Sequence, residues 1–284
     1  MFKRGATLKV LITGSAGQVG KALVHCFPVG WIICATSKNM LDITNRSQTE
    51  RVIRNFGPDV IIHAAGYTDV DSAEDNVDIC RNVNICGTEN IARAAKSVDA
   101  SLVFLSTDYV FSGHSQELYK TVDSPSPINV YGKSKAEAEA KIAEIIDKYF
   151  IVRTSWIFGD GNNFVRAIAK KARICSEIQV VEDQIGSPTY ANDLAMFLYK
   201  LVASSSYGIY HATNEGVCSR AEFAVEIISI LGLQTIVRPI LSEQYVLRAM
   251  RPNNSCLSKE SLDIGGFQRL PSWQNALNRY LKEI

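Results

Sequence analysis

Tyr131 and Lys135 lie four residues apart in the segment Tyr131-Gly132-Lys133-Ser134-Lys135. Four residues is just over one helical turn, so both side chains are expected on one face of a helix. An ammonium group near a phenol favours the phenolate and so lowers the pKa of the tyrosine, and the same charge can hold a ribose or a phosphate. Such a tyrosine can donate a proton to a substrate oxygen or accept one from it. Pairs with this spacing also arise by chance, so their meaning depends on the rest of the chain.

A glycine-rich loop follows the first apolar run of the chain. Residues 8–13 are rich in branched apolar side chains, as in a buried parallel strand, and a helical pattern begins after the loop. Gly14 permits a tight turn, Gly17 lets backbone N–H groups approach a pyrophosphate, and Gly20 lets the helix pack closely on the strand. The phosphates are expected at the positive end of that helix. The order of strand, loop and helix therefore predicts a dinucleotide site.

The end of the second strand bears on which nicotinamide cofactor binds. Residues 31–35 form the strand-like run, and Thr36-Ser37-Lys38-Asn39 follows it. An acidic residue there would hold the ribose 2′-OH of NAD, whereas a basic residue favours the 2′-phosphate of NADP. No acidic residue is present and Lys38 lies close by, so we predict NADPH, with NADH as an open alternative. A solvated loop lysine is the other interpretation of Lys38.

Strand-like and helical stretches alternate through the first half of the chain. The strand-like runs are residues 8–13, 31–35, 60–64, 102–106 and 150–153, and the helical stretches are about 17–27, 46–56, 84–97 and 132–148. This alternation predicts an α/β fold, a doubly wound parallel sheet of the Rossmann type with helices on both faces. Ligands of such sheets bind beyond the carboxyl ends of the strands. Gly14, residues 66–68 and residues 107–108 each follow a strand-like run, so we expect them at one ligand-binding edge.

The second half of the chain is less regular. We expect helices at 161–174, 192–203, 219–231 and 272–282, with short strands at 178–181 and 208–212. Residues 1–158 are predicted to form the dinucleotide-binding Rossmann domain. Residues 159–284 are predicted to form mainly a smaller C-terminal substrate-binding lobe, with part of the segment returning to the large sheet.

Composition excludes several classes of partner. The chain has 284 residues, 46% of them hydrophobic and 21% charged, as in an ordinary globular protein. A net charge of +1 gives no field that would recruit nucleic acid or an anionic membrane. The apolar runs are strand-sized, and the first residues lack the apolar core of a signal peptide. We therefore expect a cytoplasmic protein that binds neither nucleic acid nor membrane.

The cysteines and histidines give no sign of a metal site. The seven cysteines are scattered and never have Cys-x-x-Cys spacing, and the four histidines show no ligand spacing. Both observations argue against a disulfide framework and against a structural zinc site. We predict no bound metal from these residues.

Longer motifs resemble the extended short-chain dehydrogenase/reductases, and within them the branch that reduces nucleotide-linked 4-keto-6-deoxysugars. The resemblance covers essentially the whole chain. Its motifs are the loop 14–20, Leu41 to Thr44, His63 to Glu74, Asn84 to Asn90, Ser106 to Phe111, Arg153 to Trp156, Asp183 to Tyr190 with Asp193 to Ala195, and Arg251-Pro252 with Ser255, Leu257 and Ser258. The second-half motifs are the more specific ones, because epimerases and dehydratases share the cofactor domain but not the substrate lobe.

The resemblance implies a set of cofactor-binding residues. They would contact the pyrophosphate through the loop and the start of its helix, flank the adenine, and line the path to the nicotinamide. In that order they are Gly14, Gly17, Gln18, Val19 and Gly20, then Lys38, Asp42 and Ile43, then Gly66, Tyr67 and Thr68, together with Tyr131 and Lys135. The resemblance also allows Mg²⁺ and a homodimer, although no carboxylate cluster in the sequence indicates a metal.

The resemblance further implies reduction of the C4 ketone of dTDP-4-dehydro-L-rhamnose to dTDP-L-rhamnose. Tyr131 would donate the proton, Lys135 would lower the pKa of Tyr131 and hold the nicotinamide ribose, and Thr107 would hydrogen-bond the ketone oxygen. The implied substrate-binding residues are Thr107, Asp108, Trp156, Arg220 and Arg251. The two arginines are candidates for the substrate diphosphate, because a planar guanidinium suits phosphate oxygens. Arg220 departs from the family, which commonly has an aromatic residue there.

Two other functions stay open at this point. The first is a related nucleotide-sugar epimerase or dehydratase. A dehydratase would use an acidic pair after the catalytic threonine, and here Tyr109 follows Asp108. The second is a cofactor-binding module without chemistry, similar to the regulatory subunit of methionine adenosyltransferase. The presence of Thr107, Tyr131 and Lys135 together favours catalysis.

Overall fold

A six-stranded parallel sheet forms the centre of the computed structural model, which describes residues 7–27, 29–245 and 247–284. Its strands are β1 (Lys9–Thr13), β2 (Ile32–Thr36), β3 (Val60–His63), β4 (Ser101–Thr107), β5 (Tyr149–Thr154) and β10 (Gly208–His211). They lie in the order β10-β5-β4-β3-β1-β2, and every pairing is parallel. The order in which strands are added to the sheet reverses between β1 and β3, because β2 lies on one side of β1 and β3 on the other. Sheets of this type bind ligands at that point. The predicted doubly wound sheet is confirmed.

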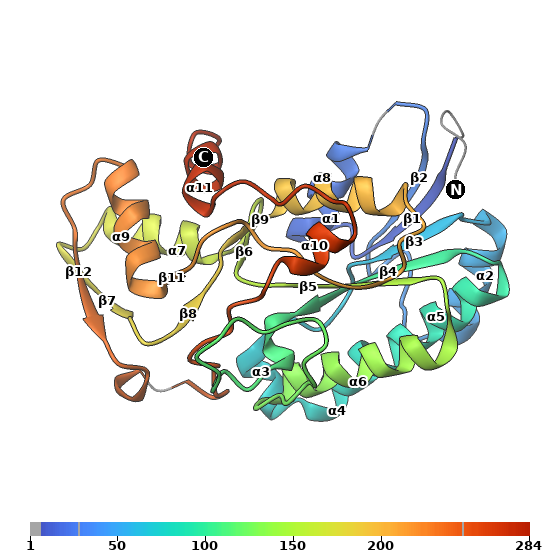
Figure 1. Ribbon diagram of the computed structural model, residues 1–284, viewed down its shortest axis with the longest axis horizontal. Helices are drawn as coiled ribbons and strands as arrows, with labels where there is room; N and C mark the ends of the chain where they lie inside the picture. The colour runs from blue at the N-terminus through green and yellow to red at the C-terminus, as the bar shows by residue number, and fades with distance from the viewer. Residues whose placement is uncertain (1–6, 28, 246) are drawn as a thin grey trace.

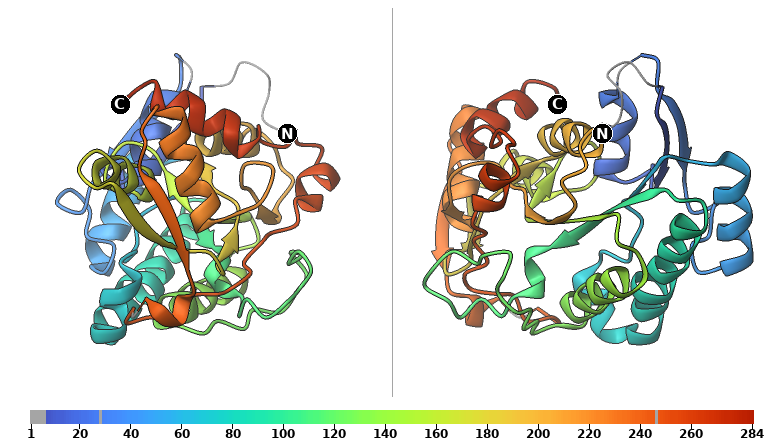
Figure 2. Two further views of the ribbon diagram at one scale, coloured as in Figure 1. Left: turned by 90° about the vertical axis from the view of Figure 1, so that its left-hand side faces the viewer. Right: turned by 45° about the vertical axis from the view of Figure 1, so that its right-hand side comes forward.

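Helices cover both faces of the sheet (Figures 1 and 2). On one face α1 (Gln18–Cys26) packs beside α8 (Ala191–Val202), and their apolar sides share a buried core with β1 and β3. On the other face lie α2 (Arg46–Phe56), α5 (Thr88–Ser97) and α6 (Val130–Ile145), with α5 contacting both of its neighbours. The branched strand residues are buried on both faces, and this explains their continuous apolar runs.

The second half of the chain builds a separate group of elements around an aromatic core. It contains α7 (Phe164–Ala172), α9 (Arg220–Ile230) and α11 (Trp273–Leu281), and a parallel pair of β7 (Glu177–Val181) with β12 (Ile236–Ile240). Two further pairs join β6 (Ile157–Phe158) to β9 (Thr189–Tyr190) and β8 (Ile185–Gly186) to β11 (Cys218–Ser219). In Figure 1 the elements α7, α9, β7 and β12 gather at the opposite end of the molecule from α2 and α5.

Part of this second half lies against the large sheet. Strand β10 pairs with β5, α8 packs on α1, and α10 (Glu260–Ile264) contacts β10. These contacts agree with the prediction that part of residues 159–284 returns to the sheet, while the domain boundary at 158 stays a prediction.

Most expected helices and strands are found within a few residues of their predicted bounds. The segment before α5 differs, because α3 (Val70–Asp75), α4 (Val77–Arg81) and a π-helical turn η1 (Asn82–Gly87) occupy a region where no helix was expected before residue 84. Short 3₁₀ turns, η2 (Asp108–Val110) and η3 (Ser242–Gln244), were also not expected. In the described part of the chain, no helix combines the length and the apolar character that crossing a membrane requires.

Candidate active site

A cavity of about 720 Å³ opens at the carboxyl ends of β1, β3 and β4. It brings together residues from the glycine loop, from the ends of three strands and from α6, α9 and the β5–β6 connection. The predicted site residues that line it are Gly14, Gly17, Gln18, Val19, Gly20, Lys38, Asp42, Ile43, Gly66, Tyr67, Thr68, Thr107, Asp108, Tyr131, Lys135, Trp156 and Arg220. Arg251 is not among the lining residues.

The glycine loop has no room for side chains at two positions. Gly14 has a φ of +69°, and a Cβ there would lie 2.6 Å from the backbone nitrogen of Ala65. A Cβ on Gly20 would lie 2.2 Å from the carbonyl oxygen of Gly14. Helix α1 begins after Gly17 with no side-chain cap and no acidic residue in its first turn, so its N-terminal amides and its dipole are available to an anion. These features fit a dinucleotide pyrophosphate.

The adenosine end of the cavity is formed after β2. Lys38 is exposed at its edge. The Asp42 carboxylate accepts hydrogen bonds from the backbone nitrogen of Thr44 (3.0 Å) and from its hydroxyl (2.7 Å). These bonds, with a smaller contribution from the Lys38 charge, lower the pKa of Asp42. Asp42 therefore shapes this turn as an ionised group, and Ile43 beside it presents an apolar surface.

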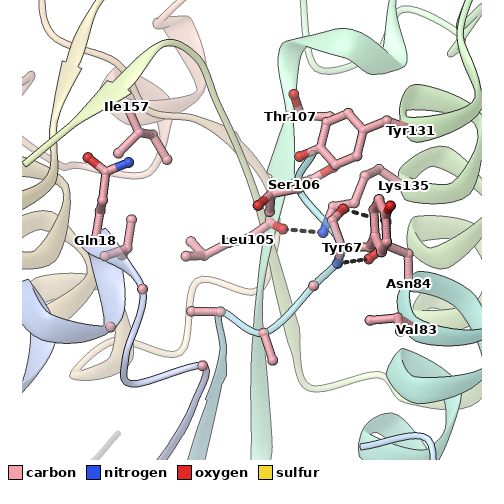
Figure 3. Close-up of a pocket in the computed structure, with 18 of the residues that line it drawn as sticks. Gln18, Tyr67, Val83, Asn84, Leu105, Ser106, Thr107, Tyr131, Lys135 and Ile157 are labelled. Carbon is pink, nitrogen blue, oxygen red and sulfur yellow. Dashed lines mark hydrogen bonds between the residues drawn. The ribbon is translucent and has the colours of Figure 1, made fainter. Parts of the chain in front are cut away.

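The segment after β3 is held by Asn84. Its side-chain oxygen accepts from the backbone nitrogen of Tyr67 (2.7 Å), and its amide donates to the carbonyl of Tyr67 (3.1 Å; Figure 3). The same amide donates to the Ser134 hydroxyl (2.9 Å). Asn84 lies in the π-helical turn η1, and such turns often occur at functional sites. The sequence motif included Asn84 without a role. A buried polar residue in a largely apolar helical stretch is the signal that could have identified it.

Gly132 allows α6 to approach the turn that follows β4. A Cβ at this position would lie 2.1 Å from the carbonyl oxygen of Tyr109. The helix begins at Val130, and the side chain of Asn129 caps it by accepting from the backbone nitrogen of Gly132 (2.7 Å). This close contact places the partly buried Tyr131 beside Thr107, across the cavity from Gln18 and Ile157 (Figure 3).

Lys135 is buried and points toward the backbone of β4. Its Nζ donates to the carbonyl of Leu105 (2.6 Å) and lies 3.8 Å from the ring centre of Phe104. Burial lowers the pKa of Lys135 to about 7, while the carboxylate of Glu139 one turn later acts in the opposite direction. The ammonium group is therefore close to its titration range at neutral pH.

The pKa of Tyr131 differs from the sequence expectation. Burial raises it first and the neighbouring Asp108 carboxylate raises it further, whereas a side-chain hydrogen bond with Thr107 acts in the opposite direction. The expected lowering by Lys135 is not seen, because the Lys135 ammonium is directed at the Leu105 carbonyl. A raised pKa keeps the phenol protonated, and a proton donor must start in that state.

Thr107 and Asp108 form a hydrogen-bonded group with Ser255. The Thr107 hydroxyl donates to Asp108 Oδ1 (3.0 Å) and accepts from the backbone nitrogen of Tyr109 (3.2 Å), and the Ser255 hydroxyl donates to Asp108 Oδ2 (2.5 Å). Asp108 is only 2% exposed. Burial raises its pKa to about 6, although the hydrogen bonds from Ser255 and Thr107 favour the ionised form.

Trp156 and Arg220 stack at the lobe side of the cavity. Trp156 has a φ of +47°, which is unusual for a bulky residue, and a Cβ on Gly186 would lie 2.6 Å from its ring. The Arg220 guanidinium carbon lies 3.6 Å from the Trp156 ring centre and 5.3 Å from that of Phe164. Burial lowers the pKa of Arg220, opposed by Tyr109 and Asp108 nearby. Arg220 thus presents a partly satisfied positive charge to the cavity.

Arg251 is committed to a different contact. Its guanidinium donates to both carboxylate oxygens of Asp71 (3.1 and 2.7 Å) and to the carbonyl of Ala249 (2.9 Å). This pair ties the segment before Ser255 to helix α3. Its predicted role at the substrate diphosphate stays a prediction without support from its position.

A buried ion pair connects the elements that carry the site residues. Arg153 on β5 binds Glu139 on α6 through Nε (3.0 Å) and through Nη2 (2.6 Å), and Glu139 also accepts from the Ser106 hydroxyl (2.5 Å). Both charged side chains are nearly inaccessible to solvent. The pair links α6 to the ends of β4 and β5, and sequence reasoning did not identify it. Among the described residues, no group of three or more His, Cys, Asp or Glu side chains is arranged to hold a metal ion.

Comparison with known families covers nearly all of the chain. The family model described as the RmlD substrate binding domain matches residues 8–284. The chain is 38% identical over 284 residues to the dTDP-4-dehydrorhamnose reductase of Aggregatibacter actinomycetemcomitans, covering 95% of this chain and 97% of that protein. It is 37% identical over 277 residues to the spore coat polysaccharide biosynthesis protein SpsK of Bacillus subtilis strain 168, covering 97% of each.

Solved structures agree with these sequence comparisons. The dTDP-4-dehydrorhamnose reductase (rfbD) of Bacillus anthracis strain Ames, in complex with NADP, superposes with a TM-score of 0.96 at 42% identity, covering 98% of this chain and 100% of that one. The UDP-glucose 4-epimerase of Thermus thermophilus, in complex with NAD, has a TM-score of 0.81 at 19% identity, covering 97% of this chain and 98% of that one. The second similarity concerns the fold alone.

Proposed function

The chain belongs to the RmlD substrate binding domain family, and from this premise we propose that it is an NADPH-dependent dTDP-4-dehydrorhamnose reductase. The main support for the proposal is that Tyr131 and Thr107 line the same cavity as the N-terminus of α1, which has no side-chain cap (Figure 3). A proton donor and a dinucleotide cradle that share one cavity are what a carbonyl reduction requires.

The cofactor is assigned to the side of the cavity formed by α1 and the ends of β2 and β3. The backbone amides of Gly17, Gln18 and Val19 would hold the pyrophosphate, and Lys38 would favour the 2′-phosphate of NADPH over NADH. Gly66, Tyr67 and Thr68, fixed through Asn84, would line the nicotinamide end. When bound, NADPH supplies the hydride for the substrate carbon.

Tyr131 is assigned as the group that protonates the C4 oxygen. The raised pKa of this phenol keeps its proton in place at neutral pH until negative charge develops on the substrate oxygen. The proton passes from the Tyr131 hydroxyl to that oxygen and leaves a tyrosinate, which recovers a proton from solvent after the product departs. Lys135 is assigned to the nicotinamide ribose, because it lines the same cavity as Tyr131 and the segment after β3.

The substrate is assigned to the lobe side of the cavity. Thr107 would donate a hydrogen bond to the ketone oxygen, and Asp108 and Trp156 would position the deoxysugar. Arg220 is the candidate for the diphosphate, because it lines the cavity and its guanidinium is positioned by its contact with the Trp156 ring. A homodimer and a cytoplasmic location remain part of the proposal as sequence-based expectations.

The proposal is tested by following NADPH and NADH oxidation with dTDP-4-dehydro-L-rhamnose, generated in place from dTDP-glucose by the preceding enzymes. We expect oxidation that requires the sugar nucleotide, is faster with NADPH, and falls about 10²–10⁴-fold in Tyr131→Phe, the contribution typical of a positioned proton donor. Tight NADPH binding without oxidation would favour the alternative of a non-catalytic regulatory subunit. Unchanged reduction by Tyr131→Phe would show that another group donates the proton.

A further inference from the structure

The hydroxyl of Thr107 has a single hydrogen, and in the structure Asp108 accepts it. It points to Asp108 Oδ1 at 3.0 Å, while the oxygen of the same hydroxyl accepts from the backbone nitrogen of Tyr109 at 3.2 Å. A hydroxyl can donate once and accept twice. An ionised Asp108 can only accept hydrogen bonds, so it occupies the one hydrogen that Thr107 would need for a ketone oxygen.

A proton on Asp108 reverses this arrangement. The carboxylic acid would then donate to Thr107 Oγ1, and the threonine hydrogen would become available to the cavity on the side where Tyr131 lies (Figure 3). Thr107 would accept from Asp108 and from the Tyr109 amide. Its hydrogen would then be free for the substrate oxygen or for the Tyr131 oxygen, with which Thr107 also hydrogen-bonds. Ser255 would keep its hydrogen bond to the other carboxyl oxygen, so the rest of the group need not move.

Electrostatics favours the same state. Reduction places negative charge on the C4 oxygen, and an ionised carboxylate in hydrogen-bond contact with Thr107 would oppose that charge. Asp108 is almost completely buried, so water screens this repulsion poorly. A neutral Asp108 removes the repulsion and also supplies the hydrogen bond that orients Thr107.

We propose that Asp108 carries a proton in the productive complex and thereby sets the direction of the Thr107 hydrogen bond. Asp108 is in this sense a positioning residue for Thr107, and it keeps its proton through the turnover, whereas the proton given to the substrate comes from Tyr131. The inference rests on the proposed reductase function.

Four titratable groups face Asp108, and one of them carries a charge near pH 6. Arg220 on α9 favours the ionised carboxylate. The other three groups are uncharged near pH 6, and an ionised Asp108 raises the pKa of each. They are Tyr109 in the turn after β4, Tyr131 on α6 and Cys256 in the segment after Ser255. Burial raises the pKa of Asp108 to about 6, so its protonation changes within the range in which the enzyme can be assayed.

Three variants and the wild type are compared by the pH dependence of kcat for the ketosugar. For the wild type we expect kcat to fall about tenfold per pH unit once Asp108 ionises. In Asp108→Asn the amide donates to Thr107 at every pH, so we expect that fall to disappear between about pH 6 and 8. In Ser255→Ala the ionised carboxylate loses a hydrogen bond, so the fall should move to higher pH. Ser97→Ala, whose hydroxyl bonds the Ala94 carbonyl outside the cavity, should leave its position unchanged.

Each alternative outcome decides the question. A fall that persists in Asp108→Asn, or does not move upward in Ser255→Ala, would assign it to another group such as Lys135 and overturn the inference. Loss of reduction by Asp108→Asn at all pH values would also overturn the inference, because an amide that donates to Thr107 should be sufficient for turnover. The infrared band of a protonated carboxyl in the NADP complex, absent in Asp108→Asn, reports the same protonation without turnover. A wild type that fails to reduce the ketosugar would instead refute the proposed function, and the infrared titration would still decide the state of Asp108.

Discussion

Substitution of Gly132 by alanine tests the contact that brings Tyr131 to the substrate. The new methyl carbon would lie 2.1 Å from the carbonyl oxygen of Tyr109 and 3.1 Å from the Cβ of Pro127. Both the oxygen and the helix are backbone, so no side-chain rotation relieves the clash. An ordinary contact begins at about 3.4 Å, so α6 and the turn after β4 must separate by roughly 1 Å. A misplacement of that size costs about 10²-fold in rate.

The assay compares kcat for NADPH oxidation in Gly132→Ala with the wild type. A 10²-fold loss corresponds to about 2.7 kcal/mol of transition-state stabilisation. NADPH binding, followed by fluorescence, should change much less, because the pyrophosphate cradle lies on α1 and not on α6. Lys133→Ala is the matched control on the same helix, since that side chain is exposed and its neighbours do not change.

A Gly132→Ala variant that is folded by circular dichroism and retains kcat within about threefold would refute this reasoning. It would mean that the turn carrying Thr107 and Tyr109 can move with the helix as one body. A loss of kcat in Lys133→Ala of the same size would show instead that any change in this turn of α6 is harmful.

Three further predictions concern charged groups. Glu139→Gln should lower the free energy of unfolding, measured by urea titration, by about 3–5 kcal/mol, because it leaves Arg153 buried without its counter-charge. Removing that carboxylate also lowers the pKa of Lys135. Activity that needs the Lys135 ammonium should therefore be lost at lower pH than in the wild type. Lys38→Ala should raise the KM for NADPH about tenfold and leave that for NADH within about twofold, since only NADPH offers a phosphate to the charge; equal changes would place the 2′-phosphate elsewhere. Arg251→Met should change the substrate KM less than about threefold, because the guanidinium is occupied by Asp71, and should reduce stability by about 1 kcal/mol in the same urea titration; a tenfold rise in KM would restore Arg251 as a diphosphate ligand.

The Lys135 group shows how far residue spacing can be trusted. The four-residue interval correctly placed Tyr131 and Lys135 on one helix, because helical periodicity is a local property of the chain. The interval could not reveal where the ammonium points. That depends on the β4 backbone, whose Leu105 carbonyl receives the Lys135 hydrogen bond. The predicted effect of Lys135 on the pKa of Tyr131 was wrong for this reason.

Arginine residues show the same limit at longer range. Arg220 and Arg251 were both candidates for a phosphate, although Arg251 belongs to a motif of the family and Arg220 departs from the family. In the structure one lines the cavity on the Trp156 ring, and the other is paired with Asp71, 180 residues earlier in the chain. The local sequence does not show which of the two reaches the cavity, because a guanidinium's partner is decided by packing between distant segments.

The sequence by itself determined the alternation of strands and helices, the glycine loop before α1 and the candidates for proton transfer. These follow from local patterns: apolar periodicity, the lack of a side chain at Gly14 and Gly20, and the spacing on α6. Only the tertiary structure decided that Ser255 reaches Asp108 across 147 residues and that Asp108 occupies the hydrogen of Thr107. Such contacts form where separate segments are buried together, and burial is also what shifts the pKa of each group, so neither can be read from neighbours in the chain.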